Sequence, residues 1–203
     1  VIAYHGDGAS SQGDVNEAYV FAASYNAPVV FFCQNNQWAI SEPIALQSRI
    51  PLFQRARGFG FPGVQVDGND VLAVHAVTRW ALKRAHQGEG PTFIEAFTYR
   101  MGAHTTSDDP TKYRLDKETA EWAGRDPITR LTAHLKRQGV IDDAWLAALD
   151  ADARDFGAEI RAAIPKLTDL TMDELFDNVY AENTVALEAQ RREYAEWAAG
   201  EQA

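Results

Sequence analysis

The sequence predicts an α/β fold built on a mostly parallel, doubly wound sheet, followed by a helical extension. Short apolar runs alternate with stretches of helical period over residues 1 to about 100, which is typical of repeated βα units. From about residue 115 onward the pattern is helical and rich in charge. We therefore expect an α/β domain over residues 1–115 and a helical extension over residues 116–203 that contacts another subunit.

Four apolar runs predict the strands of this sheet. They cover residues 1–4, 29–33, 64–66 and 91–96. The run over residues 29–33 does not alternate between apolar and polar residues, which favours a strand covered on both faces. The alternation of strand and helix signals implies a mostly parallel sheet with helices on both faces.

Helix signals lie between these strands. Asp14 and Glu17 have the spacing of a capping box, which predicts the start of a helix through residue 23. A short helix is expected near residues 53–57. Asn69 or Asp70 is expected to cap a longer helix that runs to residue 87.

The second half of the chain predicts three more helices. The first starts near residue 127, the second covers residues 143–164, and the third runs from residue 172 to about residue 197. Large aromatic side chains on the last two, such as Trp145 and Trp197, need a surface to bury against. That surface is either a partner subunit or the sheet of this chain.

The composition excludes several classes of protein. Against 19 Lys and Arg stand 29 Asp and Glu, and the formal net charge of −10 argues against a nucleic-acid or membrane-surface binder. Cys33 is the single cysteine, so no intramolecular disulfide forms and a reducing, cytoplasmic setting is favoured. No apolar run approaches the ~20 residues of a membrane span. The chain opens on a strand-like run without an initiator Met, and we expect further residues upstream.

The glycine-rich turn after the first strand does not match the common nucleotide motifs. Gly6 and Gly8 open a G-x-G pattern, but Ser11 stands where the dinucleotide fingerprint needs its third glycine. Gly8 and Gly13 have P-loop spacing, yet Asp14 occupies the position of the phosphate-binding lysine.

The ends of the first two strands instead predict a shared cation site. Asp7 follows the first strand and Asn36 follows the second, and 26 residues separate Gly8 from Asn35, enough for one helix and two short loops. If the strands are neighbours, Asp7 and Asn36 converge at the carboxyl edge of the sheet. One carboxylate and an amide oxygen suit Mg²⁺ that is also bound to phosphates. Taken alone, Asp7-Gly8 and Asn35-Asn36 are each also common turn sequences.

These residues carry a family resemblance. Gly6-Asp7-Gly8 together with Asn35-Asn36 resembles the thiamin diphosphate-binding motif. The longer segments 8–14, 33–41, 90–95 and 99–114 resemble the E1 α subunit of heterotetrameric 2-oxo acid dehydrogenases, namely the branched-chain and Gram-positive-type pyruvate enzymes. The resemblance covers residues 1 to about 140 strongly and the C-terminal helices loosely.

The resemblance implies a role for each matching residue. It implies that Asp7 and Asn36 bind Mg²⁺ through their side chains and Trp38 through its backbone carbonyl. The residues implied to contact the cofactor's diphosphate are Gly8, Ala9, Arg100 and His104. His104 is also the implied active-site histidine, which presents the site to an incoming lipoyl group. The residues implied to order its loop are Asp108, Tyr113 and Arg114.

The implied function is thiamin diphosphate-dependent oxidative decarboxylation of a 2-oxo acid, with reductive acylation of the lipoyl group of E2. The implied partners are an E1 β subunit, in an α2β2 heterotetramer, and the lipoyl domain of E2; neither nucleic acid nor a membrane is expected. One alternative is acetoin dehydrogenase or another thiamin diphosphate enzyme of the same two-subunit type. A second is a non-enzymatic scaffold that docks a partner through its acidic helices.

Overall fold

The computed structural model describes residues 1–168 and 170–201. The chain forms two compact units, Val1–Ile141 and Asp142–Ala203. This division lies later in the chain than the expected boundary after residue 115, because helices α5 (Asp116–Ala123) and α6 (Pro127–Arg137) belong to the first unit. Trp122 of α5 stacks on Tyr99, with ring centroids 5.5 Å apart, and α5 was not among the predicted helices.

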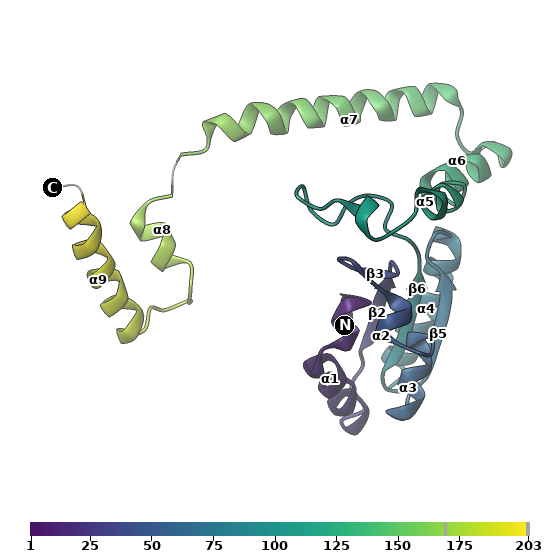
Figure 1. Ribbon diagram of the computed structural model, residues 1–203, viewed down its shortest axis with the longest axis horizontal. Coiled ribbons are helices and arrows are strands. Elements are labelled where there is room, and N and C mark those ends of the chain that lie inside the picture. The colour runs from purple at the N-terminus through teal and green to yellow at the C-terminus, as the bar shows by residue number, and fades with distance from the viewer. Residues whose placement is uncertain (169, 202–203) are drawn as a thin grey trace. The chain divides into compact units, whose positions relative to one another are not determined.

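A parallel sheet forms the centre of the first unit. Its strands are β1 (Ile2–Gly6), β2 (Val30–Asn35), β5 (Gly63–Asp67) and β6 (Thr92–Phe97), and they lie side by side in the order β1-β2-β6-β5 (Figure 1). All neighbouring pairs in this sheet are parallel. The four predicted strands are therefore confirmed, with bounds shifted by one or two residues at each end.

Helices cover both faces of the sheet, as the doubly wound prediction requires. On one face, α1 (Gly13–Ser24), the 3₁₀ turn η2 (Leu52–Gln54) and α3 (Arg55–Gly58) enclose a core around Tyr19, which packs edge-on against Phe31 and Phe93. On the other face, Ala81 of α4 (Val71–His86) packs with Val30 and other strand residues. The strand order leaves β1 and β5 at the two edges of the sheet.

The two predicted helix caps have different outcomes. Asp70 caps α4 as expected, because its Oδ1 accepts the N–H groups of Leu72 and Ala73 at 3.0 and 3.1 Å. The capping box at Asp14 is wrong. A 3₁₀ turn, η1 (Gly8–Ser11), leads directly into α1, so the N-cap is Gln12 and Asp14 already lies in the first helical turn.

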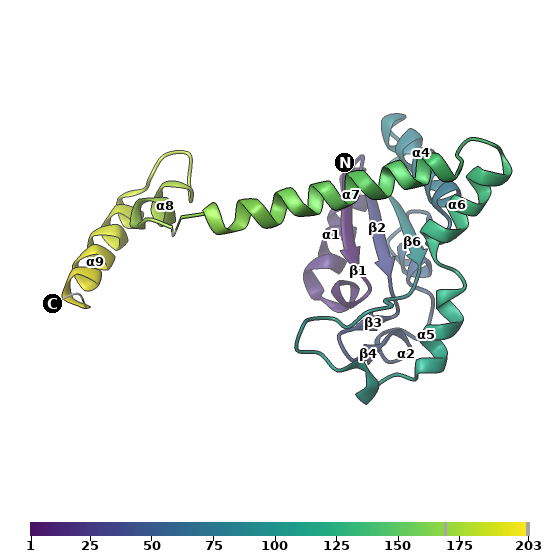
Figure 2. The ribbon, with the colours of Figure 1, turned by 90° about the horizontal axis from the view of Figure 1, so that it is seen from above.

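A short excursion follows β2 before the chain returns to the sheet. It contains a two-stranded antiparallel hairpin, β3 (Trp38–Ala39) and β4 (Glu42–Pro43), and the helix α2 (Ile44–Gln47). Figure 2 shows β3, β4 and α2 grouped beyond the ends to which the arrows of β1 and β2 point. This excursion was not predicted, and it covers the edge where the expected site lies.

The second unit consists of helices. They are α7 (Asp143–Ala163), the 3₁₀ turn η4 (Ile164–Lys166), α8 (Met172–Asp177) and α9 (Val185–Glu201). The prediction of one continuous helix from residue 172 to about 197 is wrong. The Asn178 amide donates to the carbonyl of Glu174 at the end of α8, and Thr184 Oγ1 accepts the N–H of Leu187 at the start of α9. These side chains end one helix and begin another.

Aromatic side chains of this unit pack partly on one another. Tyr194 lies 5.4 Å from Trp197 and 6.0 Å from Phe176, between ring centroids. Trp145 and Phe156 of α7 are 49% and 64% exposed. Across the described residues, no helix combines the length and apolar character that crossing a bilayer requires.

Candidate functional site

The first two strands bring Asp7 and Asn36 together at the carboxyl edge of the sheet. In the parallel register of β1 and β2, Gly6 lies opposite Gln34, so the residues that follow each strand emerge side by side. The backbone N–H of Asn36 donates to Asp7 Oδ1 at 3.3 Å. The convergence expected from the spacing of the motif is thus present.

The Asp7 carboxylate is buried, and in the described part of the chain it forms no ion pair. The residue is 1% exposed, and its Oδ2 accepts the Gln47 amide at 3.2 Å while Oδ1 accepts the Asn36 N–H. Both donors are neutral and both hydrogen bonds are long. None of the ion pairs recorded for residues 1–168 and 170–201 includes Asp7. Because burying an unpaired charge is costly, this carboxylate is well suited to receive a cation.

The oxygen donors around Asp7 fit a magnesium ion that also binds phosphate. Asn36 Oδ1 accepts the Trp38 N–H at 3.1 Å and keeps a second lone pair. No cluster of three or more His, Cys, Asp or Glu that could hold a metal occurs in the described part of the chain. A single carboxylate with amide and carbonyl oxygens leaves coordination positions for phosphate and water, which Mg²⁺ prefers to keep.

The backbone after Asn36 is bent sharply to form this site. Gln37 and Ile40 adopt left-handed conformations with φ of 72° and 56°, which non-glycine residues rarely adopt. Asn35 and Thr98 stabilise the turn, because Asn35 Oδ1 accepts the Gln37 N–H at 3.0 Å and the Thr98 carbonyl accepts the Gln37 amide at 2.7 Å. The hairpin that follows returns residues 38–47 over the strand ends.

Gly8 is required by this hairpin. A Cβ at position 8 would lie 2.8 Å from the Cβ of Ala39, closer than packed side chains approach. The turn η1 that begins at Gly8 is closed by Ser10, whose hydroxyl donates to the Asp7 carbonyl at 2.6 Å. Ala9 lies within this turn. The contact of Gly8 and Ala9 with a diphosphate stays a prediction.

Arg100 lies beside the same edge and holds the hairpin. Its guanidinium donates to the carbonyls of Trp38 and Ile40 at 3.2 and 2.6 Å, and to the Tyr113 hydroxyl at 2.8 Å. The Arg100 guanidinium lies so near the Trp38 carbonyl that it would repel a metal ion bound to this carbonyl, unless an anion lay between the guanidinium and the ion. This arrangement is compatible with the expected diphosphate contact of Arg100, and it leaves the Trp38 ligand role as a prediction.

The loop that carries His104 is ordered by the residues expected to order it. The buried Arg114 guanidinium donates to the carbonyls of Arg100, Met101 and Gly102. The His104 N–H and the Tyr113 hydroxyl both donate to Asp108 Oδ2, at 2.8 and 2.6 Å.

These two hydrogen bonds also stabilise the ionised form of the Asp108 carboxyl. The His104 N–H, followed by the Tyr113 hydroxyl, holds the pKa of the Asp108 carboxyl below its usual value. His104 itself is exposed, so its imidazole is accessible at the end of an ordered loop. Its catalytic role stays a prediction.

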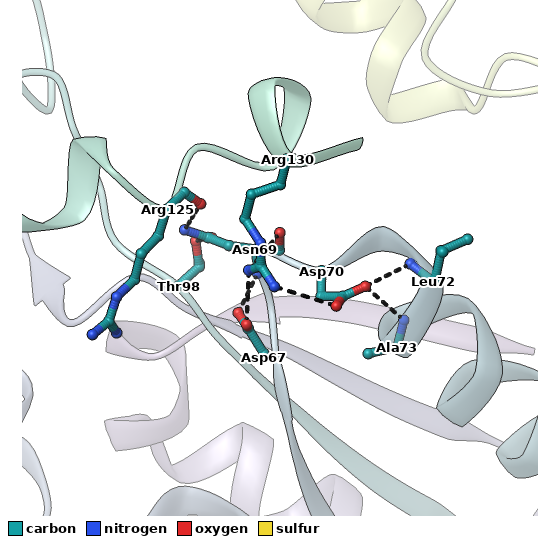
Figure 3. Close-up of polar contacts among 8 residues, drawn as sticks. All are labelled: Asp67, Asn69, Asp70, Leu72, Ala73, Thr98, Arg125 and Arg130. Carbon is teal, nitrogen blue, oxygen red and sulfur yellow. Dashed lines mark hydrogen bonds and ion pairs between the residues drawn. The ribbon is translucent and has the colours of Figure 1, made fainter. Parts of the chain in front are cut away.

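A second polar network anchors the neighbouring strand ends. Arg130 of α6 pairs with Asp67 at 2.8 Å and with Asp70 at 3.3 Å, and the Asn69 amide donates to the Arg125 carbonyl at 2.9 Å (Figure 3). Although partial burial opposes it, Arg130 keeps the pKa of Asp67 below its usual value. The network fixes α6 to the turn between β5 and α4.

Sequence reasoning missed Gln47 as a contributor to the site. Gln47, which contacts Asp7, lies in a segment without a recognisable pattern, so no signal marked it. Glu95 was expected to be structural. Its position inside an apolar strand indicates that it accepts hydrogen bonds, because a buried carboxylate needs donors. It is 1% exposed and accepts hydrogen bonds from Asn35 Nδ2 at 2.7 Å and from the Phe53 N–H at 3.0 Å.

Comparison with known proteins matches most of this sequence to one family. The family model described as "Dehydrogenase E1 component" matches residues 1–172. The chain belongs to the dehydrogenase E1 component family. The resemblance inferred from its motifs is therefore confirmed, and the match includes both the strand-end site and the His104 loop.

Curated relatives of this E1 chain are similar over nearly its whole length. The 3-methyl-2-oxobutanoate dehydrogenase subunit alpha of Mycobacterium tuberculosis is 49% identical over 193 residues, which are 95% of this chain and 53% of the relative. The pyruvate dehydrogenase E1 component subunit alpha of Acholeplasma laidlawii is 42% identical over 201 residues, 96% and 57% of the two chains. The corresponding subunit of Staphylococcus epidermidis is 43% identical over 200 residues, which are 96% of this chain and 53% of the relative. The chain spans about half the length of the curated relatives it matches.

Proposed function

We propose that this chain is part of the α subunit of a 2-oxo acid dehydrogenase E1, and that it holds the magnesium and diphosphate of thiamin diphosphate. The observation that carries the proposal is the buried Asp7 carboxylate, which adjoins Asn36 and forms no ion pair within residues 1–168 and 170–201. The enzyme would decarboxylate a 2-oxo acid and pass the acyl group to a lipoyl group of E2.

Each residue of the site has a defined task in this proposal. Asp7 would supply the one negative charge to Mg²⁺, and Asn36 and Trp38 would add neutral oxygens. Gly8 and Ala9 would border the diphosphate, and the Arg100 guanidinium would balance its charge. Bound thiamin diphosphate supplies an electron sink for the carbon–carbon bond that breaks in decarboxylation.

The His104 loop would face the acyl acceptor. Asp108 and Arg114 hold this loop in place, so the exposed imidazole would keep a fixed position as the lipoyl group enters. A fixed position favours reaction because the groups need no further ordering.

The partners follow from the same assignment. The names of the relatives describe alpha subunits, which supports a complex with an E1 β subunit in an α2β2 heterotetramer and with the lipoyl domain of E2. We further propose that the helical unit contributes to the contact between subunits. The single, buried Cys33 supports a reducing, cytoplasmic setting.

The proposed substrate is a branched-chain 2-oxo acid. This choice rests on the relative that shares 49% identity, which is named for 3-methyl-2-oxobutanoate, against 42–43% for those named for pyruvate. The test is acylation of a lipoyl group by the full-length chain co-expressed with its β subunit, with 3-methyl-2-oxobutanoate, pyruvate or acetoin as the substrate. Faster turnover of 3-methyl-2-oxobutanoate than of pyruvate would support the choice. Turnover of acetoin alone would overturn it.

A further inference from the structure

Gln47 joins three segments of the chain at the proposed metal site. Its amide nitrogen donates to Asp7 Oδ2 and to the Glu42 carbonyl, both at 3.2 Å. Its amide oxygen lies 3.4 Å from the Ser11 hydroxyl, which donates to it. A single side chain at the end of α2 thus connects the turn after β1, the η1 turn and the hairpin.

Because the Gln47 amide is neutral, it leaves the negative charge of the Asp7 carboxylate in the site. Asp7 receives hydrogen bonds on both oxygens, from the Asn36 N–H and from Gln47. These two donors fix the rotation of the carboxylate, and neither of them cancels its charge. A lysine or arginine in the same place would neutralise Asp7, and an apolar residue would leave one oxygen without its donor.

We propose that Gln47 is a positioning residue for the metal site: it orients the Asp7 carboxylate for a divalent cation while leaving its charge uncompensated. This inference rests on the proposed function, because it takes Asp7 as a metal ligand. Hydrogen-bond partners of metal ligands typically contribute 10–100-fold to metal affinity. We expect a loss in that range when the amide is removed.

The experiment compares two substitutions that separate orientation from charge. The full-length chain, co-expressed with its β subunit, is prepared as wild type, Gln47→Leu, Gln47→Lys and Asp7→Asn. Gln87→Leu, at an exposed glutamine that follows α4, is the matched control. Binding of Mn²⁺ in place of Mg²⁺ is followed by electron paramagnetic resonance with thiamin diphosphate present. Unfolding in urea is measured without metal.

The two variants should differ in a way that a merely structural contact would not produce. Gln47→Leu should weaken Mn²⁺ binding about 10–100-fold. Gln47→Lys should weaken it further, because the ammonium competes for Asp7, yet its metal-free stability should equal or exceed that of the wild type. Gln87→Leu should bind Mn²⁺ like the wild type. If Gln47→Leu fails to fold, the opposite signs expected for Gln47→Lys still decide the question.

Two results would overturn the inference. One is Mn²⁺ affinity within twofold of the wild type in Gln47→Leu. The other is a Gln47→Lys variant that is less stable than the wild type and binds Mn²⁺ no more weakly than Gln47→Leu does. If the wild type itself fails to bind Mn²⁺ with thiamin diphosphate, the proposed function fails. Loss of binding in Asp7→Asn with no change in Gln47→Leu would reject the role of Gln47 alone.

Discussion

The Glu95→Ala substitution tests how the sheet supports the strand-end site. Glu95 lies on β6 and is 1% exposed, and its two carboxyl oxygens accept one hydrogen bond each. The donors are Asn35 Nδ2 at 2.7 Å and the Phe53 N–H at 3.0 Å. Removal of the carboxyl leaves both donors without an acceptor, and the truncated side chain leaves a cavity.

The cost follows from these contacts. A buried donor that loses its partner costs about 1–3 kcal/mol, so the two donors together cost about 2–6 kcal/mol before any relaxation. Phe53 is only partly buried, and water can replace part of its hydrogen bond. We expect the free energy of unfolding to fall by about 3–5 kcal/mol, which is a large part of the 5–15 kcal/mol typical of a domain.

The measurement is urea unfolding of the full-length protein, followed by tryptophan fluorescence. Glu95→Gln should cost about half as much, since its amide oxygen still accepts one of the two donors. Glu182→Ala, at an exposed glutamate, should change stability by less than about 0.5 kcal/mol. A loss below about 1 kcal/mol in Glu95→Ala would show that the Asn35 and Phe53 donors do not depend on the Glu95 carboxyl.

Three further predictions concern single side chains. Burial raises the pKa of the fully buried Cys33 thiol, so an alkylating reagent at pH 8 should label it only after unfolding; labelling of the folded protein would contradict its burial. Burial lowers the pKa of His5, so this side chain takes up a proton less readily in the folded than in the unfolded chain. The contribution of His5 to stability should therefore be complete above about pH 6.5 and decline below that pH, and His5→Gln should remove this part of the thermal-unfolding pH profile. Arg114→Ala should speed hydrogen exchange at least tenfold in residues 101–113 and leave β6 unchanged, because three carbonyls lose their donor; equal exchange in the two proteins would show that Arg114 does not order the loop.

The sheet and its edge were predictable because their signals are local. Apolar runs and a one-helix spacing predict neighbouring parallel strands, and this neighbourhood alone brings Asp7 to Asn36. The Asp70 cap was predictable for the same reason, since its two N–H partners lie only two and three residues further along the chain.

Other features depend on contacts that the sequence does not encode locally. The capping-box prediction at Asp14 failed because the η1 turn moved the helix start to Gly13. The helix expected from residue 172 is divided where the side chains of Asn178 and Thr184 bond to the backbone. Gln47 reaches Asp7 only because the unpredicted hairpin folds back across the strand ends.

The most direct test of the proposed metal site is a crystal structure of the full-length E1 complex with thiamin diphosphate and Mn²⁺ in place of Mg²⁺. Anomalous diffraction locates the manganese independently of any prior assumption about its ligands. We predict a single peak within coordination distance of the Asp7 and Asn36 side-chain oxygens and of the diphosphate. A peak elsewhere, or a diphosphate bound away from these two residues, would contradict this prediction.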